Sequence, residues 1–496
     1  MTLTTWLTAT RPTGPQPLDR RDRIRILAIC CLSLFLVGVD NTIVNVALPA
    51  IQRDLHVGVA GLQWVVAAYT VVLATLLLPA GAAGDRFGRR RTFRTGLVLF
   101  TLGTLLCSLA PGPGTLIAAR VAQAVGGSML NPVAMSIITN TFTEPRERAR
   151  AIGVWGAVAG VSLALGPLLG GALVDTVGWR AVFWATVPVG VAALVLCTRY
   201  VPESRAEHPR PLDPVGQVLI VVLLGSLTYG VIEAPTAGWT STQTLLCGTL
   251  AVLAVACYVP HALRSAAPVI DPRLFRSVPF AGASLIAVCG FAALGGFLLL
   301  NTLYLQDVRG WSPLHAGLLT LPLATLAMVC SPLSGRLVAA RGARIPLVAA
   351  GGAMALGTLL LTDLRATTGT GQLLLSYALF GLGFGMLNAP ITTTAVAGMP
   401  RERAGVAAAV ASTSRQTGQL LGVTLIGSLA TSAVHGPLRT GFAQASHVGW
   451  WVATACACTV LTLGILTTGP RAGRSAARVA RLLTPGAVNT EDGGSR

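Results

Sequence analysis

Residues 26–49 read ILAICCLSLFLVGVDNTIVNVALP, an apolar run that carries a single acidic side chain, Asp40. About 20 apolar residues form a helix that crosses the hydrocarbon core of a bilayer, so this run predicts a membrane-spanning helix. A charged side chain within that core costs roughly 2.5–3.5 kcal/mol, and it usually marks a polar pathway or a proton site. Asp40 is therefore the first candidate functional residue.

The composition of the whole chain is typical of a membrane protein. Of its 496 residues, 53% are hydrophobic and 11% are charged, and the mean hydropathy is +0.69. Soluble proteins have about 25% charged residues. The net charge of +18 reflects arginines in short segments between apolar runs, a pattern that indicates membrane topology and not a nucleic-acid partner.

Counting apolar runs predicts an all-α polytopic membrane protein with fourteen transmembrane helices. Arginines concentrate in the two termini and in every second connecting segment, which places both termini in the cytoplasm. We expect a multi-pass protein of the bacterial plasma membrane. The expected spans are residues 26–49, 61–83, 95–110, 114–140, 151–174, 180–198, 214–233, 243–262, 279–305, 314–335, 345–362, 371–397, 405–433 and 447–468.

An internal repeat divides the chain into two halves. PRERA at residues 145–149 recurs at 400–404, and GPLLG at 166–170 has the counterpart GQLLG at 418–422. Parallel repeats are found in transporters whose substrate site lies between the halves. The organisation that we expect is a cytoplasmic N-terminal segment (1–25), a six-helix half (26–199), a linker with two inserted transmembrane helices (200–278), a second six-helix half (279–468) and a disordered cytoplasmic tail (469–496).

The segment between the second and third spans reads GAAGDRFGRRR at residues 81–91. Its glycines permit a tight turn and close approach of helices, and an acid flanked by arginines can form and break ion pairs. A solvated, arginine-rich loop is the alternative explanation. The second half has Ala339 at the position of Asp85, so a switching ion pair would exist in one half only. The candidate conformational switch loop comprises Gly81, Gly84, Asp85, Arg86, Gly88, Arg89 and Arg90.

This loop resembles the signature of the major facilitator superfamily, a G-x-x-x-D-R-x-G-R-R pattern between spans two and three. The fifth span adds GPLLGG at residues 166–171, similar to the G-P-x-x-G-G motif of that superfamily's antiporters, although Ser162 replaces an upstream glycine. Without the resemblance, glycine and proline in a membrane helix would equally suit close packing and a kink. The residues that match the antiporter motif are Gly166, Pro167, Gly170 and Gly171.

Three further segments resemble the fourteen-span drug:proton antiporter branch of the superfamily. They are DNTIVNVALP at 40–49, WRAVF at 179–183 with Thr186 where that branch usually has asparagine, and YLQDVRGWSP at 304–313. The resemblance implies two six-helix halves with two inserted central helices. It also implies efflux of a small lipophilic compound, such as an antibiotic or toxic metabolite, driven by inward proton flow and alternating access.

Cofactor and partner expectations follow from the same features. The proton gradient is the energy source, and we expect no cofactor, no enzyme activity and no nucleic-acid partner. The partners are a small-molecule substrate, protons and the lipid bilayer, and we expect a monomer. Most of the ten cysteines lie in apolar runs and the six histidines lack ligand spacing, so we expect neither a disulfide framework nor a metal site.

Two other functions stay open at this point. One is a proton symporter or uniporter of a metabolite, which the fifth-span motif disfavours. The other is a non-transporting membrane receptor or enzyme, although the sequence contains no nucleotide-binding loop or nucleophile triad.

Arg120 is the candidate partner of Asp40. It begins RVAQA at residues 120–124, similar to the fourth-span R-x-x-Q-G motif, whose arginine is tied to proton coupling in family members. At 1.5 Å per residue, each of the two charges lies roughly 9 Å from the outer face, so a direct or water-bridged pair is feasible. About 254 residues further on stand Leu294 and Leu374, so neither charge has a twin. A static ion pair that stabilises the first half is the alternative.

Several polar residues are candidates for the substrate cavity, namely Asn41, Asn45, Gln123 and Arg415. Arg415 lies roughly 15 Å into its span and would bind a polar group of the substrate or, alternatively, serve packing or gating. Trp64 and Tyr69 would line a drug site or form part of the interfacial aromatic belt, and Glu233 marks a span boundary. With Asp40 as the only clear mid-span acid, neutral, zwitterionic or anionic compounds fit better than dications.

Overall fold

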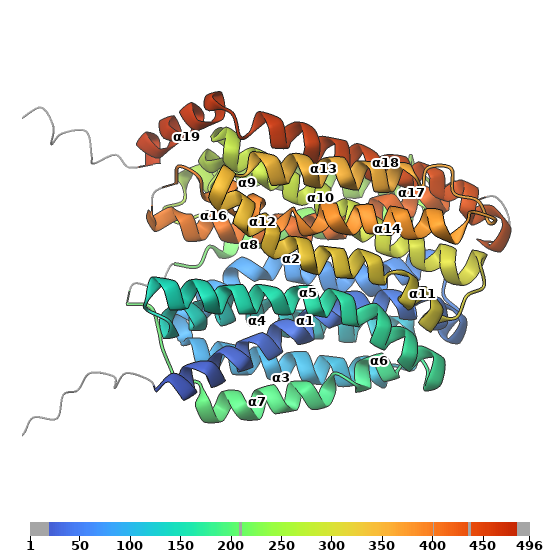
Figure 1. The fold of residues 1–496 in the computed structure, drawn as a ribbon, viewed down its shortest axis with the longest axis horizontal. Coiled ribbons are helices and arrows are strands. Elements are labelled where there is room, and N and C mark those ends of the chain that lie inside the picture. Colours follow the sequence, from blue (N-terminus) through green and yellow to red (C-terminus); the bar gives the residue numbers. More distant parts are fainter. Residues whose placement is uncertain (1–18, 208–210, 400, 435–437, 484–496) are drawn as a thin grey trace, which may run out of the picture.

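The computed structural model describes residues 19–207, 211–399, 401–434 and 438–483, and within these ranges the chain is helical with short connections and no strand. The long helices run side by side along the longest axis of the molecule (Figure 1). The N-terminal segment to residue 18, Pro400 of the second PRERA copy, and the tail beyond residue 483 lie outside the described residues.

The first half of the chain contains five long helices and one interrupted helix. Gly88 separates the second helix from the third, and its φ of 111° lies in a region that favours glycine, which lets the chain turn there without a longer loop. The helices are α1 (Arg20–Leu55), α2 (Val59–Phe87), α3 (Arg89–Ser108), α4 (Pro113–Thr141), α5 (Pro145–Thr176), α6 (Ala181–Trp184) and α7 (Val187–Tyr200).

The second half repeats this order with more interruptions. Gly342, with a φ of 79°, takes the place of Gly88. Two π-helical turns and several short breaks divide the spans. The elements are α10 (Val278–Leu303), η2 (Tyr304–Val308), α11 (Pro313–Leu319), α12 (Leu321–Arg341), α13 (Arg344–Leu359), α14 (Thr370–Gly385), α15 (Asn388–Val396), α16 (Arg401–Leu421), η3 (Gly422–Ile426), α17 (Gly427–Ser432) and α18 (Leu438–Leu466).

Eleven helices among the described residues are long and apolar enough to cross a membrane. Each of the fourteen expected spans coincides with a helix or with consecutive helices. The helices α3, α13 and α16 are not among the eleven, and α13 is also short for a span, with 16 residues. The all-α polytopic fold is therefore confirmed, while the count of fourteen stays a prediction.

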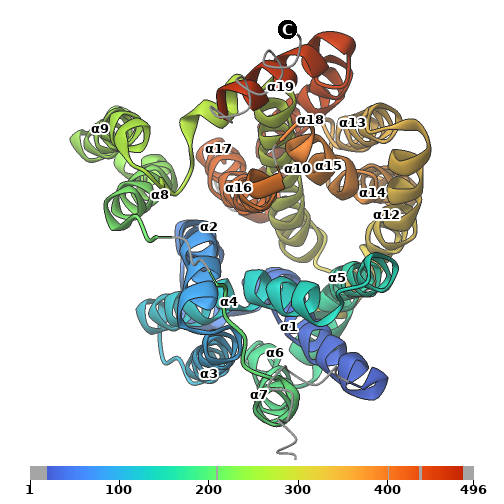
Figure 2. The ribbon, with the colours of Figure 1, turned by 90° about the vertical axis from the view of Figure 1, so that its left-hand side faces the viewer.

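Two helices, α8 (Pro214–Ala237) and α9 (Thr242–Arg264), connect the halves, followed by the short η1 (Pro272–Arg276). Seen from one end of the bundle, α1–α7 and α10–α18 form two groups, and α8 and α9 lie to one side of both (Figure 2). The side chain of Gln217 in α8 donates to the backbone carbonyl of Thr75 in α2 at 2.7 Å. Ile232 of α8 is buried together with Leu420 of the second half. The inserted pair thus touches both halves without entering either bundle.

The two ends of the chain differ from our expectations. The first helix begins at Arg20, six residues earlier than expected, because Asp19 caps it with a side-chain bond to the Arg20 amide. Residues 470–483, predicted to be disordered, form α19 (Pro470–Leu483). Alanine and arginine favour a helix, and Ala472, Ala476 and Val479 form its buried apolar face. The prediction of disorder followed the basic composition of the tail and did not consider this spacing.

Candidate functional site

Asp40 and Arg120 form a buried ion pair in the first half. Arg120 Nη1 donates to Asp40 Oδ2 at 2.7 Å, and each side chain is 2% exposed. Asp40 comes from the middle of α1 and Arg120 from the first third of α4. The similar depth of the two residues had suggested such a contact, and the structure contains it.

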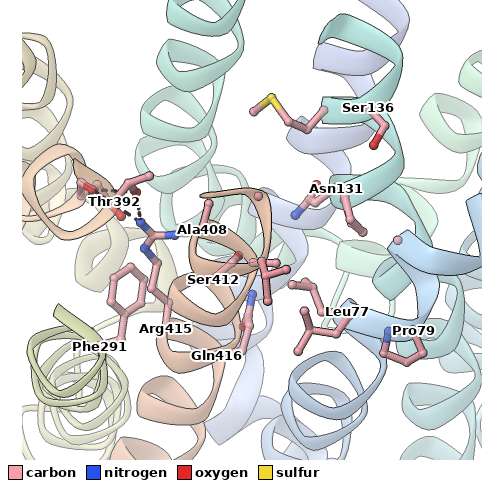
Figure 3. Close-up of a pocket in the computed structure, with 18 of the residues that line it drawn as sticks. Leu77, Pro79, Asn131, Ser136, Phe291, Thr392, Ala408, Ser412, Arg415 and Gln416 are labelled. Atoms are coloured by element: carbon pink, nitrogen blue, oxygen red, sulfur yellow. Dashed lines mark hydrogen bonds between the residues drawn. The ribbon is translucent and has the colours of Figure 1, made fainter. Parts of the chain in front are cut away.

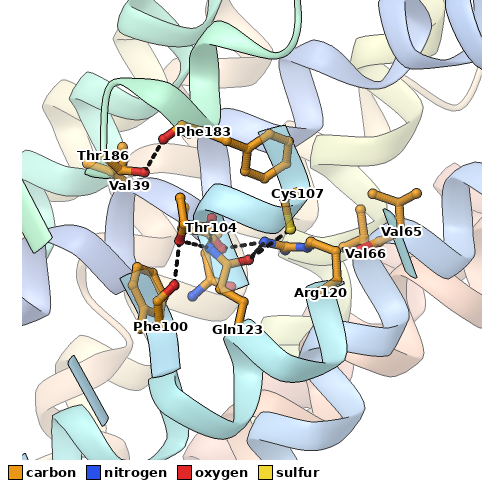
Figure 4. Close-up of polar contacts among 12 residues, drawn as sticks. Val39, Val65, Val66, Phe100, Thr104, Cys107, Arg120, Gln123, Phe183 and Thr186 are labelled. Atoms are coloured by element: carbon orange, nitrogen blue, oxygen red, sulfur yellow. Dashed lines mark hydrogen bonds and ion pairs between the residues drawn. The ribbon is translucent and has the colours of Figure 1, made fainter. Parts of the chain in front are cut away.

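Gln123 completes the set of partners around this pair. It lies one turn after Arg120 on α4, and its Nε2 donates to Asp40 Oδ1 at 2.8 Å and to Thr104 Oγ1 at 2.8 Å. Its Oε1 accepts from Arg120 Nη1 at 2.6 Å (Figure 4). Both oxygens of the Asp40 carboxylate are therefore hydrogen-bonded, as a buried charge requires.

The helix α2 holds the other side of the arginine. Arg120 Nε donates to the backbone carbonyl of Val65 at 3.2 Å, and its guanidinium carbon lies 4.1 Å from the centre of the Tyr69 ring. Removing one partner of a buried ion pair typically costs about 3–5 kcal/mol. Almost none of the carboxylate is exposed, so in this conformation the cluster shields Asp40 from solvent.

A cavity of about 1510 Å³ lies between the two halves. Its wall includes Gly38, Asn41 and Thr42 of α1, together with residues of α2, α4 and α5 and, from the second half, α10, α12, α15 and α16. Its mouth includes Asp85 and Asp213, at the end of the bundle where α1 begins. Asp40 does not line it, because adjacent helical residues differ by about 100° in direction and Asp40 points toward α4.

Contacts between the halves close the opposite end of the bundle. Gln306 Nε2 donates to the backbone carbonyl of Val46 at 2.9 Å, and the Leu314 amide donates to Asp175 Oδ2 at 2.9 Å. On the other side of the bundle, Gln63 Nε2 donates to the carbonyl of Val423 at 3.0 Å. The cavity therefore opens toward one end of the bundle and is sealed from the other.

Two of the four predicted cavity residues line the cavity, namely Asn41 and Arg415. Asn45 does not: it is one turn nearer the closed end, 3% exposed, and its Nδ2 donates to the Asn41 carbonyl at 2.9 Å. Gln123 does not line it either, because its side chain is occupied by Asp40, Arg120 and Thr104.

The candidate switch loop is held by contacts within itself, with α4 and with the start of the linker between the halves. Asp85 pairs with Arg89 one turn later at 3.0 Å, and the Arg89 amide donates to the Ser204 carbonyl at 2.9 Å. The Arg90 amide donates to Glu203 Oε1 at 3.1 Å. Gly84 packs on Val133, Gly81 lies on Pro132, and the guanidinium carbon of Arg86 lies 5.8 Å from the centre of the Phe87 ring. A switching role for this loop stays a prediction.

The glycines of the antiporter motif lie where α5 meets two other helices. A Cβ atom on Gly166 would lie 1.8 Å from Thr42 Oγ1, and one on Gly170 would lie 2.8 Å from Ile43 Cγ1, so α5 rests directly on α1. A Cβ on Gly171 would meet the Pro313 carbonyl oxygen at 2.6 Å, across the closed end. Ser162, which replaces a glycine of the motif, faces Gly38, and the small residue on α1 makes room for it.

Sequence reasoning left the places of Tyr69 and Trp64 open and missed two other residues. Tyr69 is fully buried beneath Arg120, and Trp64 donates to Glu233 Oε1 of α8 at 2.9 Å; neither lines the cavity. Gln63 and Gln306, which join the halves, were not singled out. The signal that could have identified them is a polar amide side chain within or beside an apolar run.

Comparison with known proteins agrees with this arrangement. Residues 30–423 match the family model described as Major Facilitator Superfamily. The chain is 40% identical over 411 residues to the multidrug resistance protein Stp of Mycobacterium tuberculosis (82% of this chain and 76% of that protein). It is 37% identical over 423 residues to the tetracenomycin C resistance and export protein of Streptomyces glaucescens (85% and 78%).

A solved structure shares the fold at much lower identity. It is that of a bacterial homologue of the human lysosomal transporter Spinster, with a TM-score of 0.63 and 19% identity, covering 93% of this chain and 99% of that one. The family match covers most of the chain, and the relatives are resistance and efflux proteins. This chain is therefore a transporter of the major facilitator superfamily, in its multidrug and antibiotic efflux branch.

Proposed function

We propose that the protein exports a small lipophilic compound, such as an antibiotic, in exchange for protons by alternating access. The observation that carries the proposal is a cavity of about 1510 Å³ between the halves that is sealed at one end, beside a helix with a buried acid. Alternation between openings at the two ends moves a bound compound across the membrane. Relatives named for multidrug resistance and for tetracenomycin C export support a drug as the substrate.

Asp40 is the proposed proton carrier. Its helix also forms part of the cavity wall, through its neighbours Asn41 and Thr42. A movement of α1 relative to α4 would part Asp40 from Arg120 and Gln123 and expose the carboxylate to a proton. Re-formation of the pair favours the charged carboxylate and releases that proton. Proton binding and the cavity would thereby be linked through one helix.

The proposed orientation places the cavity mouth and both termini in the cytoplasm of a bacterium, with a single chain in the plasma membrane. The arginine-rich segments support this orientation. Energy comes from the proton gradient alone, so the proposal includes no cofactor.

The test uses inverted membrane vesicles from cells that contain or lack the protein, with the vesicle lumen made acidic. We expect uptake of at least one compound from an antibiotic panel, abolished by a protonophore. In the Asp40→Asn variant, gradient-driven uptake should fall to the protonophore level, while exchange of labelled for unlabelled compound without a gradient continues, because only proton coupling is lost.

Three other results would contradict the proposal. Full gradient-driven uptake by Asp40→Asn would exclude Asp40 as the proton carrier. Compound movement in the same direction as protons would indicate a symporter. No movement of any compound by a correctly folded protein would indicate a receptor.

A further inference from the structure

Arg415 is a cation on the cavity wall whose guanidinium group is only partly hydrogen-bonded. It lies on α16, and its Nη2 donates to Thr392 Oγ1 at 2.5 Å and more weakly to the Asn388 carbonyl at 3.5 Å. Its Nε is buried and has no hydrogen-bond partner. None of the ion pairs found among the described residues includes Arg415. A guanidinium in such a place favours an anionic partner.

The acids of the cavity wall lie at the mouth and are engaged. Asp85 pairs with Arg89, and Asp213 pairs with His261 at 2.8 Å. Asp271 Oδ1 accepts from the backbone amide of Arg273 at 3.0 Å. Asp40, the acid in the middle of α1, is enclosed by Arg120 and Gln123 and does not line the cavity. Arg273, the other described cation that lines the cavity, is exposed in η1 near Asp271 at the mouth, so among the described residues the formal charge of the inner cavity wall is the positive charge of Arg415.

The surroundings of Arg415 combine an aromatic wall with polar amides. Phe291 of α10 (Figure 3) and Phe384 of α14 line the same cavity as Arg415, and their rings meet edge to face at 5.1 Å between centroids. Gln416, next to Arg415, and Asn131 on the facing helix α4 each have a buried side-chain oxygen without a partner. A flat aromatic compound with one acidic group matches this set. Its ring would pack against the phenylalanine rings, its acidic group would pair with Arg415, and its polar substituents would face the amides of Gln416 and Asn131.

We propose that Arg415 binds the ionised acidic group, a carboxylate or phenolate, of an aromatic substrate whose ring packs against Phe291 and Phe384. This inference rests on the proposed transport function and names its substrate class. The alternative is that Arg415 only anchors α16 to α15 through Thr392. Binding of matched probes that differ in charge alone separates the two roles.

The experiment uses the purified full chain in nanodiscs of neutral phosphatidylcholine and three anthracene probes of similar shape. The probes are 9-anthracenecarboxylate (anion), 9-anthracenecarboxamide (neutral) and 9-(aminomethyl)anthracene (cation), and binding is measured by fluorescence anisotropy against empty nanodiscs. We expect the wild type to bind the anion about tenfold more tightly than the amide, the gain of one charge-assisted bond, and the cation most weakly.

Three variants assign the preference to its residue. Arg415→Gln should bind anion and amide equally, and Arg415→Lys should keep part of the preference because the charge remains. Arg344→Gln, which removes an exposed arginine at the start of α13 that does not line the cavity, should keep all of it.

The inference would be overturned if the wild type did not bind the anion, or if it bound the anion equally well without Arg415. It would also be overturned if both Arg415 variants lost all three probes equally, because that result indicates a packing role. Gradient-driven uptake in the vesicles described above is measured separately. Uptake without an anion preference refutes this inference alone, whereas an Arg415-dependent preference without any uptake refutes the transport function alone.

Discussion

Asp40 is tolerated in a membrane-spanning helix because every part of its charge has a partner. One carboxylate oxygen accepts from Arg120 and the other from Gln123. The arginine in turn is held by the Val65 carbonyl and the Tyr69 ring on a third helix. Such a cluster is stable while closed and costly when one partner is removed, which is the behaviour that the proposed proton carrier requires.

The Tyr69 ring provides the first residue-scale prediction. Its face lies under the Arg120 guanidinium, but its buried hydroxyl has no partner. Tyr69→Phe keeps the ring, removes an unpaired polar atom, and should leave stability unchanged or slightly raised. Tyr69→Leu should lower the free energy of unfolding by about 2 kcal/mol, because a desolvated cation loses its aromatic partner. Thermal unfolding in detergent checks both variants; equal damage by both would assign the effect to the hydroxyl instead.

At the scale of elements, the glycines of α5 set how closely it packs against α1. Each half has the same contact: glycines at 418 and 422 of α16 and η3 lie against the backbone of α10 as those at 166 and 170 lie against α1. Small residues let membrane helices approach closely, and dispersion contacts then stabilise the pair. The repeat in the sequence is thus a repeat of helix packing.

Gly166→Ala should disrupt that packing. The added Cβ would lie 1.8 Å from Thr42 Oγ1, so α1 and α5 must separate, at a cost of about 1–3 kcal/mol. Gly153→Ala on the same helix is the matched control, because no atom lies within 4 Å of its Cβ and alanine has the higher helix propensity. The two variants are compared by thermal unfolding with a thiol-reactive dye. The dye labels buried cysteines such as Cys30 and Cys107 as they become exposed. Similar unfolding temperatures would contradict the packing argument.

At the scale of the whole molecule, the two halves meet tightly at one end and enclose the cavity toward the other. The closed end depends on small residues facing carbonyl groups: a Cβ on Gly317 of α11 would lie 2.4 Å from the carbonyl oxygen of Pro167, in the antiporter motif. The motif therefore belongs to the seal between the halves as well as to the α1 contact. Inserted helices α8 and α9 stand outside this arrangement (Figure 2).

Gly317→Ala should destabilise the closed end and shift the population toward the state that is open there. Hydrogen–deuterium exchange should become faster in residues 313–319 and slower around the cavity mouth at residues 81–85, since one end closes as the other opens. Gly352→Ala on α13, whose Cβ would have no neighbour within 4 Å, should leave both regions unchanged. Unaltered exchange at residues 313–319 in Gly317→Ala would show that this contact does not hold the seal.

The sequence by itself determined the membrane location, the duplicated halves, the motif positions and the similar depth of Asp40 and Arg120, because hydropathy, spacing and helical rise are local properties. Only the tertiary structure decided which side each residue faces. A membrane helix is apolar toward lipid and toward protein alike, so no periodic pattern reveals that Asp40 faces α4 while Asn41 faces the cavity, or that Asn45 lies beyond it. The ordered helix α19 needed the same information, because its buried face is defined by the helices against which it packs.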